Sequence, residues 1–345
     1  MEFISGVRKK DCCELADLLD VKSTEVVKLN GCIHSIRDMG EFAFILLRKR
    51  DGLVQCILEG ANPNCRINEL KEGMTVELEG VLYQEERAPH GFEIKIERLK
   101  ILSAPKEGAV FPLPISKWKM KASLEAKLEY RPISLRNIRE RAIFKIQEGI
   151  VRAFRDYLYS QGFTEIRTPK IVAGNAEGGA NVFKLDYFGR KAFLAQSPQF
   201  YKQTMVGVYD RVFETGPVFR AEKHNTGRHL NEYTSLDFEM GYIDGFEDVM
   251  AMETGFLIYL FDFLREKYAR ELSLLDVSLP VIDKIPAVRF DIAKQLVAEK
   301  YDYKIRDPYD LQPEEEQLIG RYFKEEYDSD FVFVTHYPSK KRPFY

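Results

Sequence analysis

The chain of 345 residues has few cysteines, and they are not spaced as metal ligands. No CxxC pair occurs, and no histidine stands at a distance that would complete a tetrahedral zinc site. We therefore expect reduced thiols, as in a cytoplasmic protein, and no zinc site. The five cysteines are Cys12, Cys13, Cys32, Cys56 and Cys65.

A long hydrophobic run is also missing, because no apolar stretch reaches the roughly 18 residues that a transmembrane helix needs. Charged residues interrupt every apolar run in residues 1–20, so the sequence predicts no secretory leader and no membrane partner. Charge of one sign is not in excess either, since 51 Lys and Arg stand against 54 Asp and Glu, a net charge of −3. Any nucleic acid would therefore be held by local patches rather than by the field of the whole surface.

The length and a hydrophobic content of 45% predict two domains, or three small ones. Residues 1–22 form a short lead with leucines at helical spacing beside acids. In residues 23–104, five stretches of alternating residues follow one another at hairpin spacing, with glycines near their ends. This pattern predicts a small antiparallel barrel, most economically an OB-fold. Three prolines and then a basic run in residues 105–130 predict a hinge.

Residues 131–345 predict a second domain in which strands and helices do not alternate strictly. Apolar residues recur every three or four positions over residues 135–161, which predicts one long helix, and the strand FTEIRTP follows it. Further along, the sequence predicts two hairpins and a second long helix over residues 246–271. Together these elements predict an α+β domain with an antiparallel sheet flanked by helices.

One of these hairpins, residues 213–240, carries more candidate chemistry than any comparable stretch. Its arms, VFETGPVFRAE and NEYTSLDFEM, alternate with period two, so Arg220 and Glu222 share a face of the first arm. An arginine can hold phosphate through two parallel hydrogen bonds, an acid can accept from an adenine amino group, and an aromatic such as Tyr233 can stack on a base. The pattern alone leaves two interpretations open, a nucleotide site and a solvated charged hairpin.

The residues FRAE followed by RHLNEYTSLDFEM resemble motif 2 of the class II aminoacyl-tRNA synthetases, in the form found in aspartyl-tRNA synthetases of the archaeal and eukaryotic type. In that family the arginine matching Arg220 contacts the α-phosphate and the amino-acid carboxylate. The acid matching Glu222 holds the adenine amino group, and Tyr233 matches the aromatic that stacks on adenine. The resemblance implies that Arg220 is catalytic and that ATP is bound by Arg220, Ala221, Glu222, Arg228, His229, Leu230 and Tyr233.

The segment QSPQFYKQ, residues 196–203, is typical of a helix that begins at a proline and turns Gln199 and Lys202 to one side. On this pattern alone, Lys202 is more simply a surface lysine. In aspartyl-tRNA synthetases the matching residues bind the amino acid, and the lysine faces its side-chain carboxylate. The segment AEGGANVF resembles the loop of that family whose glutamate receives the substrate ammonium group. The resemblance implies that aspartate is bound by Glu177, Gln199, Lys202, Arg220 and Asp237.

Four residues of the barrel align with positions at which this family reads the tRNA anticodon, namely Phe44, Arg48, Gln55 and Glu93. An aromatic that stacks on a splayed base, with polar groups for the base edge, is what single-stranded RNA recognition requires. Each residue by itself is more typical of a barrel wall. Cys32 stands where some relatives have tryptophan, which leaves open whether tRNA for asparagine is also charged.

The resemblance as a whole implies an enzyme that activates aspartate with ATP and Mg²⁺ and then charges tRNA. The helix and strand ending at Pro169 resemble motif 1, which implies a homodimer. The third motif and the acidic magnesium-binding segment do not occur before KKRPFY, so we expect a C-terminally truncated catalytic domain with no metal site in this chain. The alternatives are an asparaginyl-tRNA synthetase, which Lys202 argues against, and a non-catalytic RNA-binding relative or truncated fragment.

Overall fold

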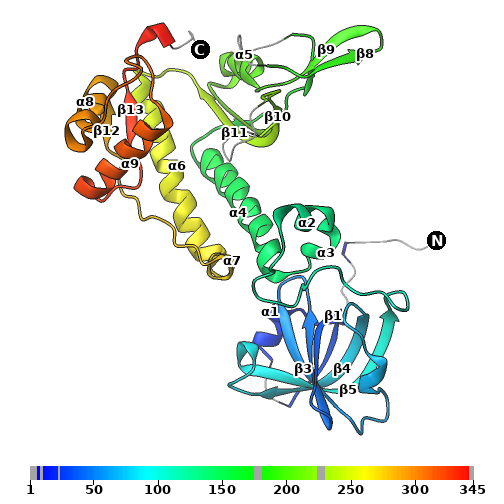
Figure 1. Cartoon of the computed structure of the whole chain (residues 1–345). Coiled ribbons are helices and arrows are strands. Elements are labelled where there is room, and N and C mark those ends of the chain that lie inside the picture. The colour runs from blue at the N-terminus through cyan, green and yellow to red at the C-terminus, as the bar shows by residue number, and fades with distance from the viewer. Residues whose placement is uncertain (1–5, 8–10, 22–23, 175–180, 224–229, 342–345) are drawn as a thin grey trace. The chain divides into compact units, whose positions relative to one another are not determined.

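The chain divides into two compact units, residues 1–141 and residues 142–345 (Figure 1). The first unit contains a barrel, and the second contains helices and small sheets. The predicted α+β class with an N-terminal OB-fold barrel is confirmed. The computed structural model describes residues 6–7, 11–21, 24–174, 181–223 and 230–341.

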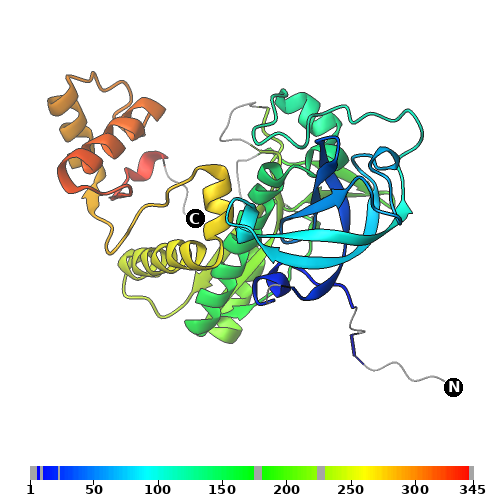
Figure 2. The same cartoon turned by 90° about the horizontal axis from the view of Figure 1, so that it is seen from below.

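Five strands of the first unit close into a barrel in the order β1-β2-β3-β5-β4 (Figure 2). Every second residue of β2, β3 and β4 is buried, which is why the sequence alternates there. The expectation that all pairs are antiparallel is wrong for β3 and β5, because a closed ring with an odd number of strands cannot alternate direction throughout. The strands are β1 (Val26–Asp38), β2 (Phe42–Arg48), β3 (Leu53–Glu59), β4 (Thr75–Gln84) and β5 (Phe92–Ser103), with the 3-10 turns η1 (Ile67–Glu69) and η2 (Pro89–Gly91).

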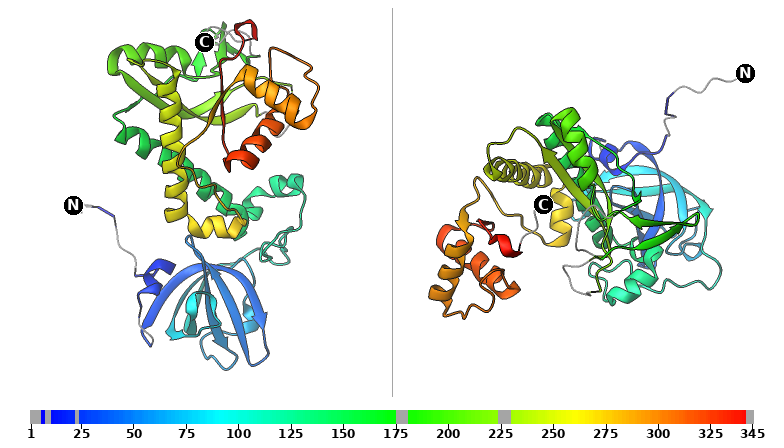
Figure 3. Two further views of the ribbon diagram at one scale, coloured as in Figure 1. Left: turned by 90° about the vertical axis from the view of Figure 1, so that its left-hand side faces the viewer. Right: turned by 90° about the horizontal axis from the view of Figure 1, so that it is seen from above.

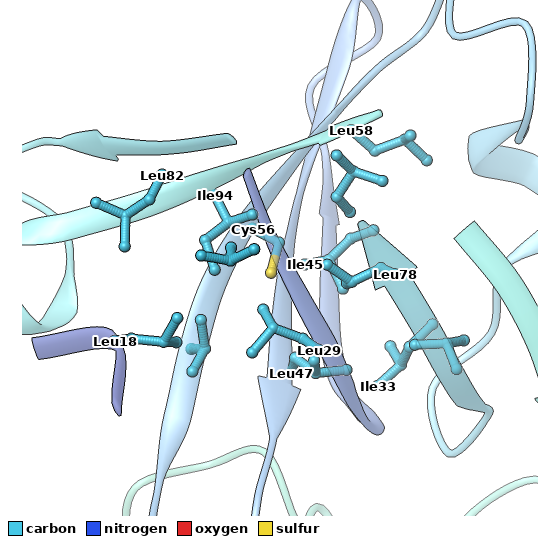
Figure 4. Packing of buried hydrophobic residues seen from close by; sticks show 14 of the residues in the cluster. Leu18, Leu29, Ile33, Ile45, Leu47, Cys56, Leu58, Leu78, Leu82 and Ile94 are labelled. Carbon is cyan, nitrogen blue, oxygen red and sulfur yellow. The ribbon is translucent and has the colours of Figure 1, made fainter. Parts of the chain in front are cut away.

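Aliphatic side chains from the barrel strands and from helix α1 (Leu15–Leu19) fill the barrel (Figure 4). Leu15 and Leu18 of this helix are buried, so part of the N-terminal lead belongs to the barrel core. Full burial of one such side chain stabilises the fold by about 1.5–3 kcal/mol. The fully buried residues of the strands include Leu29, Ile33, Ile45, Leu47, Leu58, Leu78, Leu82 and Ile94.

The chain forms a small separate core after β5. Leu113, Ile115 and Met120 are buried there, and the helices α2 (Leu124–Glu129) and α3 (Arg131–Ser134) follow. Ser123 caps α2, since its hydroxyl oxygen accepts a hydrogen bond from the backbone N–H of Ala126 at 3.2 Å. The segment predicted as a hinge thus contains packed structure, while the domain boundaries inferred from the sequence stay predictions.

A three-stranded sheet in the order β11-β10-β6 lies at the centre of the second unit (Figure 1). The hairpin of β10 and β11 is antiparallel, as predicted, whereas β6 pairs in parallel with β10. The alternation of one strand predicts its faces but not the direction of its neighbour. The strands of this unit are β6 (Thr164–Glu165), β7 (Ile171–Val172), β8 (Lys184–Tyr187), β9 (Arg190–Leu194), β10 (Arg211–Phe219), β11 (Glu232–Met240), β12 (Ala287–Arg289) and β13 (Phe333–Thr335).

Two long helices, α4 (Ile138–Ser160) and α6 (Phe246–Lys267), pack on this sheet and on each other. They approach closely at Gly149, where an added Cβ would lie 2.7 Å from a methyl carbon of Leu264. The second long helix ends earlier than predicted, because Tyr268 separates α6 from α7 (Ala269–Leu275). Phe154 of α4 contacts Phe213 of β10, with ring centroids 5.7 Å apart. The face of the hairpin opposite the helices is therefore available for chemistry.

The helices α8 (Phe290–Tyr301) and α9 (Pro313–Tyr327) form a pair beside the parallel strands β12 and β13 (Figure 3). Between them Lys294, which is 5% exposed, donates to both carboxylate oxygens of Glu315 at 2.8 and 2.7 Å. The same ammonium donates to the carbonyl oxygens of Asp307 and Asp310. This buried charge is thus fully surrounded by acceptors. The turn η3 (Ser339–Lys341) follows β13.

His34 is the extra residue of a bulge in β1, between Ile33, which pairs with Leu47, and Ser35, which pairs with Leu46. His34 is 2% exposed, and its Nδ1 lies 3.5 Å from Nη1 of Arg48. Burial, followed by the charges of Arg48 and Arg141, lowers the pKa of His34 to about 4.

We expect the first unit to lose stability as the pH falls from 6.5, the ordinary pKa of histidine, toward about 4. The unfolded chain binds the proton first in this interval, so the contribution of neutral His34 is complete above the interval and lost below it. The loss is about 3 kcal/mol at about 1.36 kcal/mol per pKa unit. Urea unfolding of the wild type and of His34→Gln across this interval checks the prediction, since the variant should lack this part of the pH dependence. Equal losses in the two proteins would contradict it.

Candidate functional site

The candidate site lies on the face of the β10–β11 hairpin that is turned away from the helical core. Leu236, Phe238 and Met240 of β11 pack against the aromatic core beneath. The alternate residues Tyr233 and Asp237 therefore share the opposite face with Ser235 and Glu239. In the register of the hairpin, Asp237 pairs with Glu214, Ser235 with Gly216 and Tyr233 with Val218. β11 alternates as the sequence predicts, whereas β10 ends at Phe219. Arg220 and Glu222 therefore lie beyond the strand, and the prediction that they share a face of it is wrong.

Arg220 follows directly after β10, and its backbone N–H donates to the carbonyl oxygen of Asn231 at 3.0 Å. Its guanidinium lies over the ring of Tyr233, with Cζ 5.9 Å from the ring centroid. This contact is a cation–π interaction that holds a planar cation beside an aromatic surface. Such a pair can offer hydrogen bonds to a phosphate and a stacking surface to a base.

The other residues predicted to bind ATP differ in burial, and the structure does not describe all of them. Ala221 and Glu222 are half-buried next to Arg220, and Leu230 is exposed on the opposite arm. The backbone N–H of Ala221 donates to the carbonyl oxygen of Asn181 at 2.9 Å. Arg228 and His229 lie outside the described residues.

Lys202 projects from α5 (Gln199–Tyr209) onto the same hairpin face. It is 5% exposed, so the interpretation of Lys202 as a surface lysine is wrong. Its Nζ lies 2.7 Å from Oδ1 of Asp237 and 3.5 Å from Oε2 of Glu239. The Ser235 hydroxyl donates to the other carboxylate oxygen of Asp237, which fixes that carboxylate. The ammonium thus sits between two acids of the hairpin.

Two glutamines lie at the start of α5 or just before it, and each has a buried side-chain atom that makes no hydrogen bond to the described residues. The Nε2 of Gln199 and the Oε1 of Gln196 are buried, and neither has a hydrogen-bond partner among the described residues. Gln196 also lines a cavity of about 290 Å³ together with Ser197 and Tyr201. A buried amide without a partner costs about 1–3 kcal/mol, so these atoms favour a polar ligand. The sequence predicted a role for Gln199 but none for Gln196, although both occur in QSPQ.

Glu177, the acid predicted to receive the substrate ammonium group, lies outside the described residues. The described chain resumes at Asn181, whose carbonyl oxygen accepts from the backbone N–H of Ala221 and from Nε2 of Gln196 at 3.1 Å. Asn181 is therefore bonded both to the end of the hairpin and to the start of the α5 region.

Glu214 is a further acid of the hairpin face that the sequence analysis missed. It is 3% exposed and accepts hydrogen bonds from the backbone N–H and hydroxyl of Thr168, at 2.8 and 2.7 Å, and from Nζ of Lys170 at 2.8 Å. These bonds connect the segment after β6 to β10, so Glu214 acts as a positioning residue. The available signal was a lone acid among the apolar residues of VFETG.

On the barrel, three of the four predicted anticodon residues, Phe44, Gln55 and Glu93, line one outward-facing cavity of about 610 Å³. Nε2 of Gln55 donates to Oε2 of Glu93 at 3.1 Å. Arg48 does not line this cavity and lies beside His34. The cavity also receives Arg37 and Arg87, two cations that the sequence analysis did not select.

Neither a metal centre nor a membrane span is found in the part of the chain that the structure describes. No group of three or more His, Cys, Asp or Glu side chains there is arranged to hold a metal ion. No described helix is both long and apolar enough to cross a membrane. The five cysteines are free.

Two family models match the chain. The model "tRNA synthetases class II (D, K and N)" matches residues 123–345, and the model "OB-fold nucleic acid binding domain" matches residues 27–102.

The aspartate–tRNA(Asp/Asn) ligase of Deinococcus radiodurans is 45% identical over 322 residues, which are 93% of this chain and 72% of the relative. The aspartate–tRNA(Asp/Asn) ligase of Aeropyrum pernix is 45% identical over 344 residues, 96% of this chain and 76% of the relative. Among solved structures, asparaginyl-tRNA synthetase from Pyrococcus horikoshii complexed with asparaginyl-adenylate is similar with a TM-score of 0.79 at 28% identity, covering 93% of this chain and 73% of that one.

Proposed function

Because this chain belongs to the class II tRNA synthetases, and among them to the aspartate–tRNA ligases, we propose that it activates aspartate with ATP and transfers the aspartyl group to tRNA. It is an enzyme of the ligase class. The observation that carries the proposal is the hairpin face on which Arg220 lies over Tyr233 and Asp237 holds Lys202. A phosphate-binding cation, a base-stacking aromatic and a carboxylate-binding cation are thereby assigned to one surface.

The first step is attack of the aspartate α-carboxylate on the α-phosphorus of ATP, with pyrophosphate as the leaving group. A carboxylate nucleophile needs no activating side chain, so the protein contributes positioning and charge neutralisation. We assign Arg220 to the α-phosphate and to the aspartate carboxylate. Tyr233 is assigned to stack on adenine, with Glu222 accepting from its amino group. Ala221, Leu230, Arg228 and His229 complete the proposed ATP set.

Aspartate binding is assigned to Lys202, Gln199, Asp237 and Glu177. Gln196, whose buried Oε1 has no hydrogen-bond partner among the described residues, is added to this set. An ammonium has three donors, and Asp237 takes one of them at 2.7 Å. A second donor can bind the side-chain carboxylate of aspartate. A buried cation binds this carboxylate better than it binds the neutral side-chain amide of asparagine. Mg²⁺ is proposed to accompany ATP. The described residues contain no group of three or more His, Cys, Asp or Glu side chains that could hold this ion.

The tRNA is proposed to bind through the barrel cavity, where Phe44 offers a stacking surface and the Gln55–Glu93 pair offers polar groups for a base edge. The two relatives named above carry tRNA(Asp/Asn) in their names, which supports the charging of both tRNAs. Arg48 remains assigned to tRNA contact outside this cavity. We further propose a homodimer through α4 and the strand that follows it, and a cytoplasmic location.

Charging assays on the full-length protein test this function directly. We expect radiolabelled aspartate to be attached to tRNA for aspartate and also to tRNA for asparagine, while labelled asparagine is attached to neither. Transfer of asparagine would instead support the asparaginyl alternative. Tight tRNA binding without any adenylate formation would support a non-catalytic relative and contradict the proposal.

A further inference from the structure

The chain has no excess of positive charge overall, yet one stretch is strongly basic. Residues 117–141 contain eight Lys and Arg against three Asp and Glu, a balance of +5 in a chain whose net charge is −3. The stretch begins in the 20 residues between the two family matches, which end at residue 102 and resume at residue 123. Its first five residues, KWKMK, are therefore assigned no role by either match.

This segment is held in a defined conformation. Asn137, which is 1% exposed, donates from Nδ2 to the carbonyl oxygens of Ile115 and Lys117 at 2.8 and 2.7 Å. Met120 is 6% exposed in the small core that also contains Ile115. A buried amide and a buried side chain thus anchor the segment at both ends of Trp118. Pre-organisation of this kind lowers the entropy that a binding partner must offset.

The exposed side chains of this anchored segment are one aromatic and three cations. Trp118, the single tryptophan of the chain, is 50% exposed. Lys117, Lys119 and Lys121 are exposed around it. A half-exposed tryptophan between lysines matches the two needs of RNA binding, a surface for base stacking and cations for the backbone phosphates. The positive balance of the stretch favours a polyanion over an apolar partner.

We propose that residues 117–121 form a second RNA-binding element, distinct from the barrel cavity, that contacts the substrate tRNA outside its anticodon loop. Trp118 stacks on an unpaired or terminal base, and Lys117 and Lys121 contact neighbouring phosphates. This inference rests on the proposed function, since it takes tRNA as the ligand. It adds a contact that increases tRNA affinity without taking part in adenylate formation.

The test compares two RNA probes, whole tRNA for aspartate and its isolated anticodon stem-loop, by fluorescence anisotropy at several salt concentrations. We expect Trp118→Ala to weaken binding of whole tRNA about tenfold and to leave stem-loop binding unchanged. The double variant Lys117→Gln/Lys121→Gln should reduce the slope of log K against log salt by about 1–2 for whole tRNA. Matched controls are Tyr242→Ala, at an aromatic that is 94% exposed, and Lys284→Gln/Lys304→Gln, at two exposed lysines of the second unit.

Several results would overturn the inference. Unchanged affinity and salt slope in both variants would do so, as would equal weakening of whole tRNA and stem-loop. Equal loss of binding to poly-glutamate would show a general anion-binding patch instead of an RNA site. Failure of the wild type to bind or charge tRNA is a separate outcome that counts against the proposed function. If Trp118→Ala folds poorly, the lysine double variant still tests the inference, because its substitutions lie on the surface. Circular dichroism checks that this variant is folded.

Discussion

Replacing Arg220 with alanine is expected to lower aspartate-dependent ATP–pyrophosphate exchange by about 10³-fold or more in the full-length protein. The guanidinium is assigned to the α-phosphate, where negative charge develops as the aspartate carboxylate attacks. Its position over the Tyr233 ring pre-organises it, so the charge is in place before the reaction and no solvent needs to reorganise. Exchange measured without tRNA isolates this step from the transfer of the aspartyl group.

Two further variants make the result specific. Arg190→Ala removes the same charge from an exposed position in β9 and should leave exchange within a few fold of the wild type. Arg220→Lys keeps the charge but loses the two parallel hydrogen bonds of the guanidinium, so we expect it to recover a small part of the activity. Near-normal exchange by Arg220→Ala would refute the assignment.

A second large effect is expected from Lys202→Ala, which should raise the KM for aspartate by about 10²-fold and leave the KM for ATP within a few fold. The substitution removes the donor for the substrate carboxylate. It also leaves Asp237 and Glu239 without the ammonium that lies between them, so that they repel an anionic substrate. Steady-state exchange kinetics with each substrate varied in turn measure both constants.

The expected change in KM separates a binding role from a structural one. A lysine that merely neutralised Asp237 would lower Tm on replacement without shifting the balance between the two KM values. Asp237→Asn tests this neighbour directly, because it removes the ion pair while Lys202 remains. The exposed Lys184 of β8 offers a matched control as Lys184→Ala. A lowered Tm with an unchanged KM for aspartate would contradict the role of Lys202.

The sequence was most informative where periodicity and burial coincide. The five barrel strands, the long helix α4 and the β10–β11 hairpin follow from alternation and from apolar spacing, because one face of each is buried. The break at Tyr268 could not be predicted, since apolar spacing continues through it. The parallel pairing of β3 with β5 follows from closure of the whole ring, which no local pattern contains.

The site was less accessible from the sequence because it depends on contacts between distant elements. The resemblance identified Lys202, but its ion pair with Asp237 joins residues 35 positions apart. Glu214 was missed for the same reason, since its partners Thr168 and Lys170 lie more than 40 positions earlier. Arg48 was grouped with Phe44, Gln55 and Glu93 because the resemblance aligns all four with anticodon-reading positions, whereas its place at the end of β2 puts it beside His34.

One carbonyl oxygen, that of Asn181, has a consequence for the order and strength of substrate binding. It accepts from Ala221, which is assigned to the ATP side, and from Gln196, which borders the amino-acid side. Ordering either donor by one substrate also fixes the acceptor that the other donor uses. We therefore expect the two binding equilibria to be thermodynamically linked, and linkage is reciprocal. Whatever factor ATP contributes to the affinity for aspartate, aspartate contributes equally to the affinity for ATP.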